Sequence, residues 1–250
     1  GAGLVLGTRA EGAAPAAADK PEQWLNWVIP LPKEAAIKQQ VTVPVGEVKL
    51  TLRTGAGELE QNAFRKLQGL FFDKAGNGGA SGDNRQFEIL LGVCDAQGRI
   101  GDVTVPDAAR LQTLPNREQA YLIRPLGTDR LALTALDARG VFYAAQTLRQ
   151  LLEPRFKGDS VTVPLAVITD WPDLSERGLW GGSATRDIEW MADRKMNVVE
   201  FHSPHEVLSN GQATASVDQD LIRRGRLNAV NMVPIIQHLN HMGSRGVYDA

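Results

Sequence analysis

The four histidines of this 250-residue chain lie close together near its C-terminal end, as two His-x-x-His pairs. The first pair is His202 and His205, and the second is His238 and His241. Each pair follows a short apolar run that is typical of a buried β-strand. Imidazoles can hydrogen-bond, transfer protons or bind metals, and in α/β proteins such groups gather where parallel strands end. The spacing therefore predicts a functional site at the ends of consecutive strands.

Three kinds of chemistry are open to these histidines. Histidine together with the nearby carboxylates of Glu200 and Glu206 could bind Zn²⁺. Residues three apart on a strand point to opposite faces, however, and His205 follows Pro204 in a predicted loop, so convergence on one ion requires loops of suitable curvature. The other possibilities are hydrogen bonding to a sugar and a structural role, which suits His238 best. We expect no metal and no other cofactor.

The composition is that of an ordinary globular protein. Hydrophobic residues make up 43% of the chain, charged residues 22%, and the net charge is −2. There is no basic surface for nucleic acid, no polybasic patch, and no apolar run of the ~20 residues that a membrane span needs. Cys94 is the only cysteine and lies in an apolar run, which indicates a buried hydrophobic residue. We therefore predict neither nucleic acid nor a membrane as a partner.

Residues 1–21 are expected to form a flexible N-terminal lead-in. Residues 1–19 are rich in Ala and Gly, contain no aromatic residue and show no periodicity. They are either the remnant of an export signal or a plain disordered terminus. The Ala-Pro-Ala-Ala-Ala run favours export, and we predict an extracytoplasmic location, periplasmic or secreted.

Residues 22–168 are expected to form an α+β domain. Two prolines make residues 27–32 extended, and apolar residues at helical spacing predict a helix over 63–72. A second helix is predicted over 137–152, with one apolar face and Pro154 as its stop. Strands grouped with a few helices on one face are typical of an α+β fold. The expected strands are 41–45, 48–52, 87–93, 161–163 and 166–168, with 120–126 and 131–135 forming a hairpin.

Residues 169–250 change to alternation of strands and helices. Strands are predicted at 177–180, 197–202 and 231–236, with helices at 185–195 and 216–228 between them. Ser183 or Thr185 is the expected cap of the first of these helices. This alternation predicts the first three βα units of a (β/α)₈ TIM barrel. The barrel is expected to be truncated, because a closed barrel needs ~200 residues or more.

Several segments resemble, in order, the β-N-acetylhexosaminidases of glycoside hydrolase family 20. Residues 28–32, Val-Ile-Pro-Leu-Pro, are similar to the opening motif of that family, and residues 140–152 resemble the last helix of its N-terminal domain. Asp170-Trp171-Pro172 followed by Arg177-Gly178-Leu179 resembles its entry into the first barrel strand, and residues 195–202 resemble its second strand. The match covers residues 27–241 in outline.

The resemblance implies a retaining hydrolase for terminal N-acetylhexosamine residues with substrate-assisted chemistry. In that family the 2-acetamido oxygen of the substrate attacks the anomeric carbon, an Asp orients the acetamido group, and a neighbouring Glu protonates the leaving oxygen. That pair follows the fourth barrel strand, so no catalytic residue is assigned within this chain. We expect the fragment alone to be inactive.

The resemblance also implies sugar-binding residues. Arg177 is similar to a first-strand Arg that holds sugar hydroxyls, and His241 to the histidine after the third strand. The chain departs from the family at His205 and Glu206, where two aspartates are usual, and at residues 234–237, Pro-Ile-Ile-Gln, where Pro-Glu-x-Asp is usual. The predicted substrate-binding residues are Arg177, His202, His205, Glu206, Gln237 and His241.

A non-catalytic carbohydrate-binding module on the same scaffold is the alternative function. Either function implies an N-acetylhexosamine-containing glycan as the partner, and an incomplete barrel implies self-association through its open edges. Trp180 at a strand end is a candidate for stacking on a sugar, whereas Trp171 and Trp190 are expected to pack against neighbouring elements.

Overall fold

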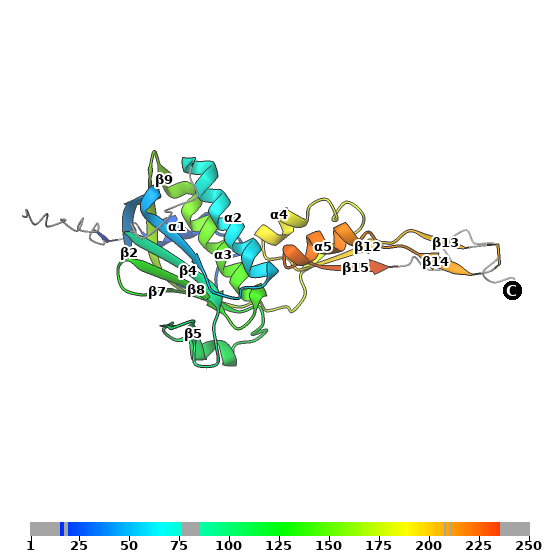
Figure 1. Ribbon diagram of the computed structural model, residues 1–250, viewed down its shortest axis with the longest axis horizontal. Helices are drawn as coiled ribbons and strands as arrows, with labels where there is room; N and C mark the ends of the chain where they lie inside the picture. Colours follow the sequence, from blue (N-terminus) through cyan, green and yellow to red (C-terminus); the bar gives the residue numbers. More distant parts are fainter. Residues whose placement is uncertain (1–15, 18–19, 77–85, 208, 211, 236–250) are drawn as a thin grey trace, which may run out of the picture.

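The computed structural model describes residues 16–17, 20–76, 86–207, 209–210 and 212–235. Within these ranges, an eight-stranded mixed sheet is followed along the chain by a three-stranded parallel sheet. Figure 1 shows the large sheet and its helices at one end of an elongated molecule, with the C-terminal strands extending from it. No helix of the described ranges is long and apolar enough to cross a membrane.

The large sheet has the order β1-β2-β10-β7-β8-β4-β3, with β9 paired to β10. Strand β10 runs antiparallel to β2 and β7, whereas β4 runs parallel to both β3 and β8. The predicted hairpin is present as the antiparallel pair β7–β8. The strands are β1 (Ala16–Ala17), β2 (Glu34–Pro44), β3 (Val48–Leu52), β4 (Phe87–Val93), β7 (Tyr121–Pro125), β8 (Arg130–Ala135), β9 (Phe156–Lys157) and β10 (Ser160–Asp170).

Two helices, α2 (Glu58–Ala75) and α3 (Ala138–Leu152), cover one face of this sheet. Helix α3 begins where Asp137 caps it, its side chain accepting a hydrogen bond from the Arg139 N–H at 2.9 Å. Gly140 allows α3 to lie directly on the sheet, because a Cβ there would be 2.3 Å from the Ala120 carbonyl oxygen. The predicted α+β fold is therefore confirmed.

A smaller apolar cluster lies on the other face of the sheet. The 3₁₀ segment Ala108–Thr113 and the short strands β5 (Arg99–Ile100) and β6 (Val103–Thr104) border it. Leu90 and Leu122 of the sheet pack there, and Cys94 is buried among them, as expected from its apolar run.

The parallel sheet has the order β11-β12-β15 and is connected by α4 and α5. Strand β12 runs parallel to both neighbours, which confirms the predicted alternation. The residues of β12 alternate: Val199 and Phe201 are buried against the core, whereas Glu200 and His202 are exposed on the other face. The elements are β11 (Gly178–Trp180), α4 (Ile188–Asp193), β12 (Val198–His202), α5 (Gln219–Leu227) and β15 (Asn231–Ile235).

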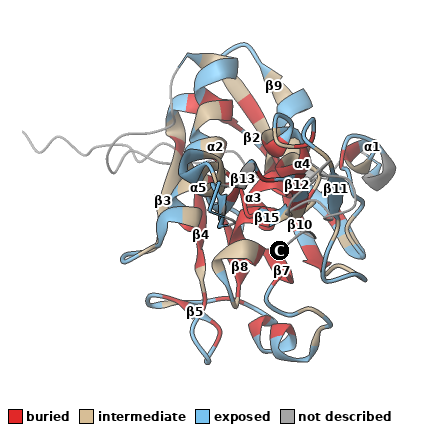
Figure 2. Ribbon diagram, turned by 90° about the vertical axis from the view of Figure 1, so that its right-hand side faces the viewer, coloured by how far each residue is buried: buried red, intermediate tan, exposed pale blue. Residues whose placement is uncertain are grey.

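Both sheets share one hydrophobic core. Ile188 and Met191 of α4 belong to the same buried cluster as Phe142 of α3. Asn62 of α2 donates to the Leu227 carbonyl oxygen of α5 at 2.6 Å. Figure 2 shows this buried zone continuing from the large sheet into β12. The parallel sheet is thus fixed to the helices of the α+β fold.

The structure corrects several local predictions. A short helix that was not predicted, α1 (Pro21–Leu25), precedes residues 27–32, which form neither a helix nor a strand. Helix α4 begins later than expected because Thr185 donates to the Gly182 carbonyl oxygen in a turn, which leaves Asp187 at the cap. His205 was expected in a loop but lies in β13 (His205–Val207), which pairs antiparallel with β14 (Ala213–Ala215).

Candidate functional site

The carboxyl ends of β11 and β12 bring two exposed rings together. Trp180 ends β11, and His202 ends β12. Their ring centroids are 5.3 Å apart with an interplanar angle of 83°, an edge-to-face arrangement. The side chain of Trp180 is 64% exposed, so most of its surface is accessible to a ligand. An indole beside an imidazole can stack on an apolar sugar face while hydrogen-bonding to its hydroxyls.

A pocket of about 420 Å³ adjoins His202. It lies between the turn after β11 and the segment that leads into α5. The Asp218 carboxylate caps α5, accepting from the Asp220 N–H at 2.9 Å and the Leu221 N–H at 3.2 Å. The pocket is lined by Gly182, Thr185, Phe201, His202, Pro204, Ser216, Val217, Asp218 and Leu221.

The other predicted histidines cannot be placed with this pair. The backbone of His205 and Glu206 belongs to strand β13, which pairs with β14. Gln237, His238 and His241 lie outside the described residues. Within the described ranges, no three His, Cys, Asp or Glu side chains are grouped to hold a metal ion. The predicted site that these histidines would form at the ends of consecutive strands therefore stays a prediction.

Arg177 lies at the opposite, amino end of β11. Its backbone N–H donates to Asn197 Oδ1 at 2.8 Å, and its guanidinium binds the Lys195 carbonyl oxygen through Nη2 at 2.7 Å and through Nε at 3.2 Å. Nη1 donates to the Leu174 carbonyl oxygen at 2.5 Å, and Nη2 also donates to Gln119 Oε1 at 2.9 Å. Because Gly178 pairs with Val198, Arg177 and His202 are at different ends of the sheet. Arg177 thus joins β11 to the connection before β12 and to the α+β domain.

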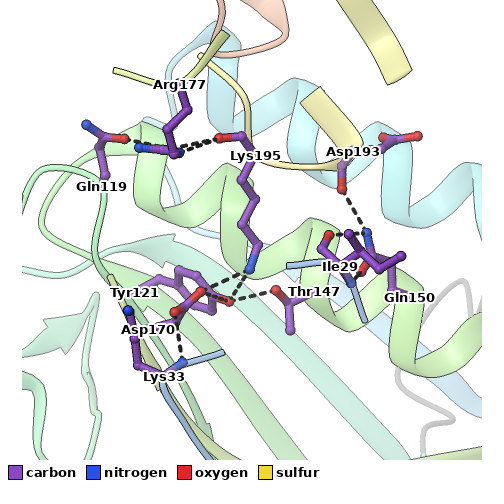
Figure 3. A network of polar contacts seen from close by, with 10 residues as sticks. All are labelled: Ile29, Lys33, Gln119, Tyr121, Thr147, Gln150, Asp170, Arg177, Asp193 and Lys195. Carbon is purple, nitrogen blue, oxygen red and sulfur yellow. Dashed lines mark hydrogen bonds and ion pairs between the residues drawn. The ribbon is translucent and has the colours of Figure 1, made fainter. Parts of the chain in front are cut away.

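A buried ion pair lies next to this arginine, as Figure 3 shows. Lys195 Nζ donates to Asp170 Oδ2 at 3.0 Å and to the Tyr121 hydroxyl at 2.7 Å. The same hydroxyl lies 2.7 Å from Thr147 Oγ1, and Asp170 Oδ1 accepts from the Lys33 N–H at 3.0 Å. The network connects β7 and β10 of the large sheet and helix α3 to the α4–β12 connection.

Burial dominates the electrostatics of this network. It lowers the pKa of Lys195, although the charge of Asp170 and the hydrogen bond to it act in the opposite direction. Burial likewise raises the pKa of Tyr121 well above its ordinary value, and the neighbouring Asp170 charge adds to that effect. Lys195 has a left-handed backbone, φ 58°, at the turn between α4 and β12. The ammonium, the carboxylate and the phenol all hydrogen-bond to one another.

Sequence reasoning did not identify Lys195, Asp170 and Tyr121 as a group. Asp170 and Tyr121 are 49 residues apart, and Lys195 follows Asp170 by 25 residues, so no local pattern joins them. The available signal was a Lys between an amphipathic helix and an apolar strand, where a charged side chain is unusual unless it is paired.

Comparisons with known proteins agree with this architecture. The sequence profile of glycosyl hydrolase family 20, domain 2, matches residues 26–171, which are 146 of the 250 residues. No protein among the curated sequences matches the chain.

Solved structures share the fold over most of the chain. They include an exo-β-N-acetylglucosaminidase of family 20 from Vibrio harveyi in complex with N-acetylglucosamine (TM-score 0.59, 16% identity, covering 89% of this chain and 37% of that one). A chitobiase from Flavobacterium johnsoniae has a TM-score of 0.58 at 15% identity, with 86% and 35% covered. A β-N-acetylhexosaminidase from Bacteroides fragilis has a TM-score of 0.53 at 18% identity, with 83% and 44% covered. The chain spans less than half the length of these three proteins.

The family assignment rests on the profile match, since structural likeness at such identities establishes the fold alone. The matched residues include β2, the β7–β8 hairpin, α3 and β10, which are the framework of the large sheet. The chain belongs to glycosyl hydrolase family 20.

Proposed function

We propose that this chain is the N-terminal part of a glycoside hydrolase that removes terminal N-acetylhexosamine residues with retention of configuration. Residues 22–168 are its α+β domain, and residues 169–250 begin its catalytic barrel. The observation that supports this most is the family match across the α+β domain, followed directly by a parallel β-α-β-α-β unit. The activities named for the solved relatives are consistent with it.

The uncovered face of the parallel sheet supports a barrel. Parallel sheets are normally covered on both faces, by helices on both sides or by closure into a barrel. Here Val199 and Phe201 face the core, whereas Trp180, Glu200 and His202 are exposed. Further βα units added beside β15 would turn this face into the interior of a (β/α)₈ barrel.

The proposed reaction is substrate-assisted. The 2-acetamido oxygen forms a bond to the anomeric carbon as the glycosidic C–O bond breaks, and the leaving oxygen takes a proton from a carboxylic acid. Water then opens the cyclic intermediate and restores the original configuration. The acid and its partner Asp would follow a fourth strand, beyond the three parallel strands of the described residues.

The sugar-binding residues within this chain are proposed at the carboxyl ends of the strands. His202 would hydrogen-bond to the sugar and Trp180 would stack on it, with His205, Glu206, Gln237 and His241 following the same strand ends. Arg177 is not at that end, and its placement favours a structural role over contact with sugar hydroxyls.

Paired substrates test the proposal in a longer protein that includes the rest of the barrel. Chromogenic N-acetyl-β-glucosaminides and N-acetyl-β-galactosaminides should be cleaved, whereas the matched glucoside, with a hydroxyl in place of the 2-acetamido group, should not. Cleavage of both substrates at similar rates would exclude substrate assistance. Binding of N-acetylglucosamine without any turnover would support a non-catalytic carbohydrate-binding module instead.

Two further features belong to the same proposal. An extracytoplasmic location suits a glycan-degrading enzyme, and secretion of the longer protein into the periplasm or medium can be measured by fractionation. Among the described residues, β15 pairs with β12 alone and the other face of the parallel sheet is exposed, and both features would make this chain alone self-associate. Sedimentation of the 250-residue chain as a monomer would contradict self-association.

A further inference from the structure

A second pocket, which we call the interdomain pocket, lies beside the Lys195 network and away from the carboxyl ends of the parallel strands. Its volume is about 180 Å³, roughly six times the volume of one water molecule in the liquid. Pro30, Leu31 and Trp171 form apolar walls, while Tyr143, Arg177 and Lys195 contribute polar atoms. The pocket therefore suits a small ligand with both an apolar and a polar part.

The Tyr143 hydroxyl in this pocket makes no hydrogen bond of normal geometry among the described residues. Burial raises its pKa, and the nearby Arg177 acts in the opposite direction. The residue is 1% exposed, and a buried hydroxyl without a partner costs about 1–3 kcal/mol. Such a group in a native structure calls for a partner that the protein chain does not supply. Its position on the pocket wall makes a ligand in the pocket the natural partner.

The cations of the pocket also have unused donors. A guanidinium has five N–H groups, and the structure gives Arg177 four side-chain hydrogen bonds, none of them to a carboxylate. An ammonium has three N–H groups, and Lys195 uses two of them, on Asp170 and Tyr121. The pocket thus holds donors of three residues and a guanidinium whose charge no acidic side chain of the described ranges neutralises.

The acidic groups of the pocket are already paired. Asp170 accepts from Lys195 and Tyr121, and Asp173 is bound to Lys33 at 2.5 Å. With Lys33, Arg177 and Lys195 against two aspartates, the pocket carries one net positive charge. A neutral sugar hydroxyl would not balance that charge, whereas a single carboxylate would. The two oxygens of a carboxylate could accept hydrogen bonds from the donors of Tyr143, Arg177 and Lys195.

We infer that the interdomain pocket binds a small organic carboxylate, with the oxygens toward Tyr143, Arg177 and Lys195 and the apolar part toward Leu31 and Trp171. The inference is independent of the proposed glycosidase activity. Because the donors come from α3, from the start of β11 and from the α4–β12 connection, a bound carboxylate would join the α+β fold to the parallel sheet. It would therefore stabilise the arrangement of the two units.

Propionate is a suitable probe, with phosphate and chloride for comparison. Calorimetric titration and thermal unfolding of the full chain should show saturable binding of sodium propionate, with a rise in Tm that sodium chloride at equal ionic strength does not reproduce. Tyr143→Phe removes one oxygen and should weaken propionate binding about tenfold, since one hydrogen bond to a charged group is lost. Arg177→Gln should abolish binding. Arg194→Gln should leave it unchanged, because Arg194 is a half-buried arginine that stacks on Trp190 and does not line the pocket.

Three results would overturn the inference. The first is no saturable response to propionate, and the second is equal propionate affinity in Tyr143→Phe and the wild type. The third is stabilisation by phosphate alone, which would assign the pocket to an inorganic anion. If Arg177→Gln does not fold, Tyr143→Phe decides the question, because it leaves the hydrogen bonds of Arg177 to Lys195, Leu174 and Gln119 in place. A crystal structure grown with propionate that shows only water in the pocket would also exclude the carboxylate.

Discussion

Individual residues join the two halves of this molecule through a buried ion pair. The Lys195 and Asp170 side chains are 5% and 9% exposed and 3.0 Å apart, and each has a further partner in the network. Removing one member of such a pair leaves the other charge buried and unpaired, which costs more than the pair itself contributes. Residues that no local pattern joins thus have large effects on stability.

Lys195→Met should therefore lower the free energy of unfolding by about 3–5 kcal/mol. Asp170→Asn should also be destabilising, and the double variant should lose less than the sum of the two single losses, because neither charge then remains unpaired. Urea unfolding measures all three variants, with Lys157→Met as a control at an exposed lysine. Additive losses would mean that the two side chains do not interact.

Trp180 offers a residue-scale test of the proposed sugar site. In the longer protein, Trp180→Ala should raise KM for an N-acetyl-β-glucosaminide by about two- to tenfold, the range expected for one lost aromatic contact. Trp190→Ala removes another exposed tryptophan, on α4, and should leave KM unchanged. Equal effects of the two substitutions on KM would contradict a contact between Trp180 and the sugar.

The position of β11 in this molecule depends on how closely its backbone approaches that of β12, as well as on the strand propensity of its residues. Strand β11 has three residues, all exposed, and its position depends on parallel pairing with β12. A Cβ at Gly178 would lie 1.8 Å from the Val198 carbonyl oxygen. Because Gly178 has no side chain, β11 and β12 can pair at this distance.

Gly178→Ala should accordingly separate β11 from β12 and destabilise the protein by about 1–3 kcal/mol or more. Gly182→Ala is the matched control, since no atom lies within 4 Å of a Cβ at that position. Urea unfolding followed by tryptophan fluorescence would report both variants. Equal stability of the two variants would contradict the predicted clash.

Helix α2 is attached to the sheet edge by a buried carboxylate. Burial acts to raise the pKa of Glu60, but the Arg53 side chain and the N–H groups of Val93 and Gly57 outweigh it, so its pKa is lowered in the folded protein. A carboxyl group with a lowered folded-state pKa stabilises the fold above its ordinary pKa, and this contribution is lost as the pH falls through the folded-state value.

The free energy of unfolding of the wild type should fall as the pH drops below the ordinary glutamate pKa of about 4.3. In Glu60→Gln this fall should be less steep, because the titrating carboxyl group is gone. Urea unfolding at a series of pH values between neutral and acidic conditions measures the slope. Glu58→Gln changes an exposed carboxylate in the same helical turn and should keep the wild-type slope. A Glu60→Gln slope as steep as that of the wild type would mean that Glu60 does not contribute.

For the whole molecule, local patterns predicted the elements and missed the contacts between them. Strand β4 and the β7–β8 hairpin were predictable because short apolar runs are bounded by turn residues. The full length of β2 was not, because its polar residues, such as Lys38 and Gln39, interrupt the apolar pattern and only pairing with β10 extends the strand. His202 was recognised by its strand-end position, whereas Trp180 became its neighbour only once β11 and β12 were in register.

The most direct test of the central claim is proton NMR of the first sugar released by the longer protein from a chromogenic N-acetyl-β-glucosaminide. A retaining, substrate-assisted hydrolase must release β-N-acetylglucosamine first, and the α anomer should appear only by later mutarotation. We predict that result. Initial release of the α anomer, or no release from this substrate by the folded longer protein, would contradict the assignment.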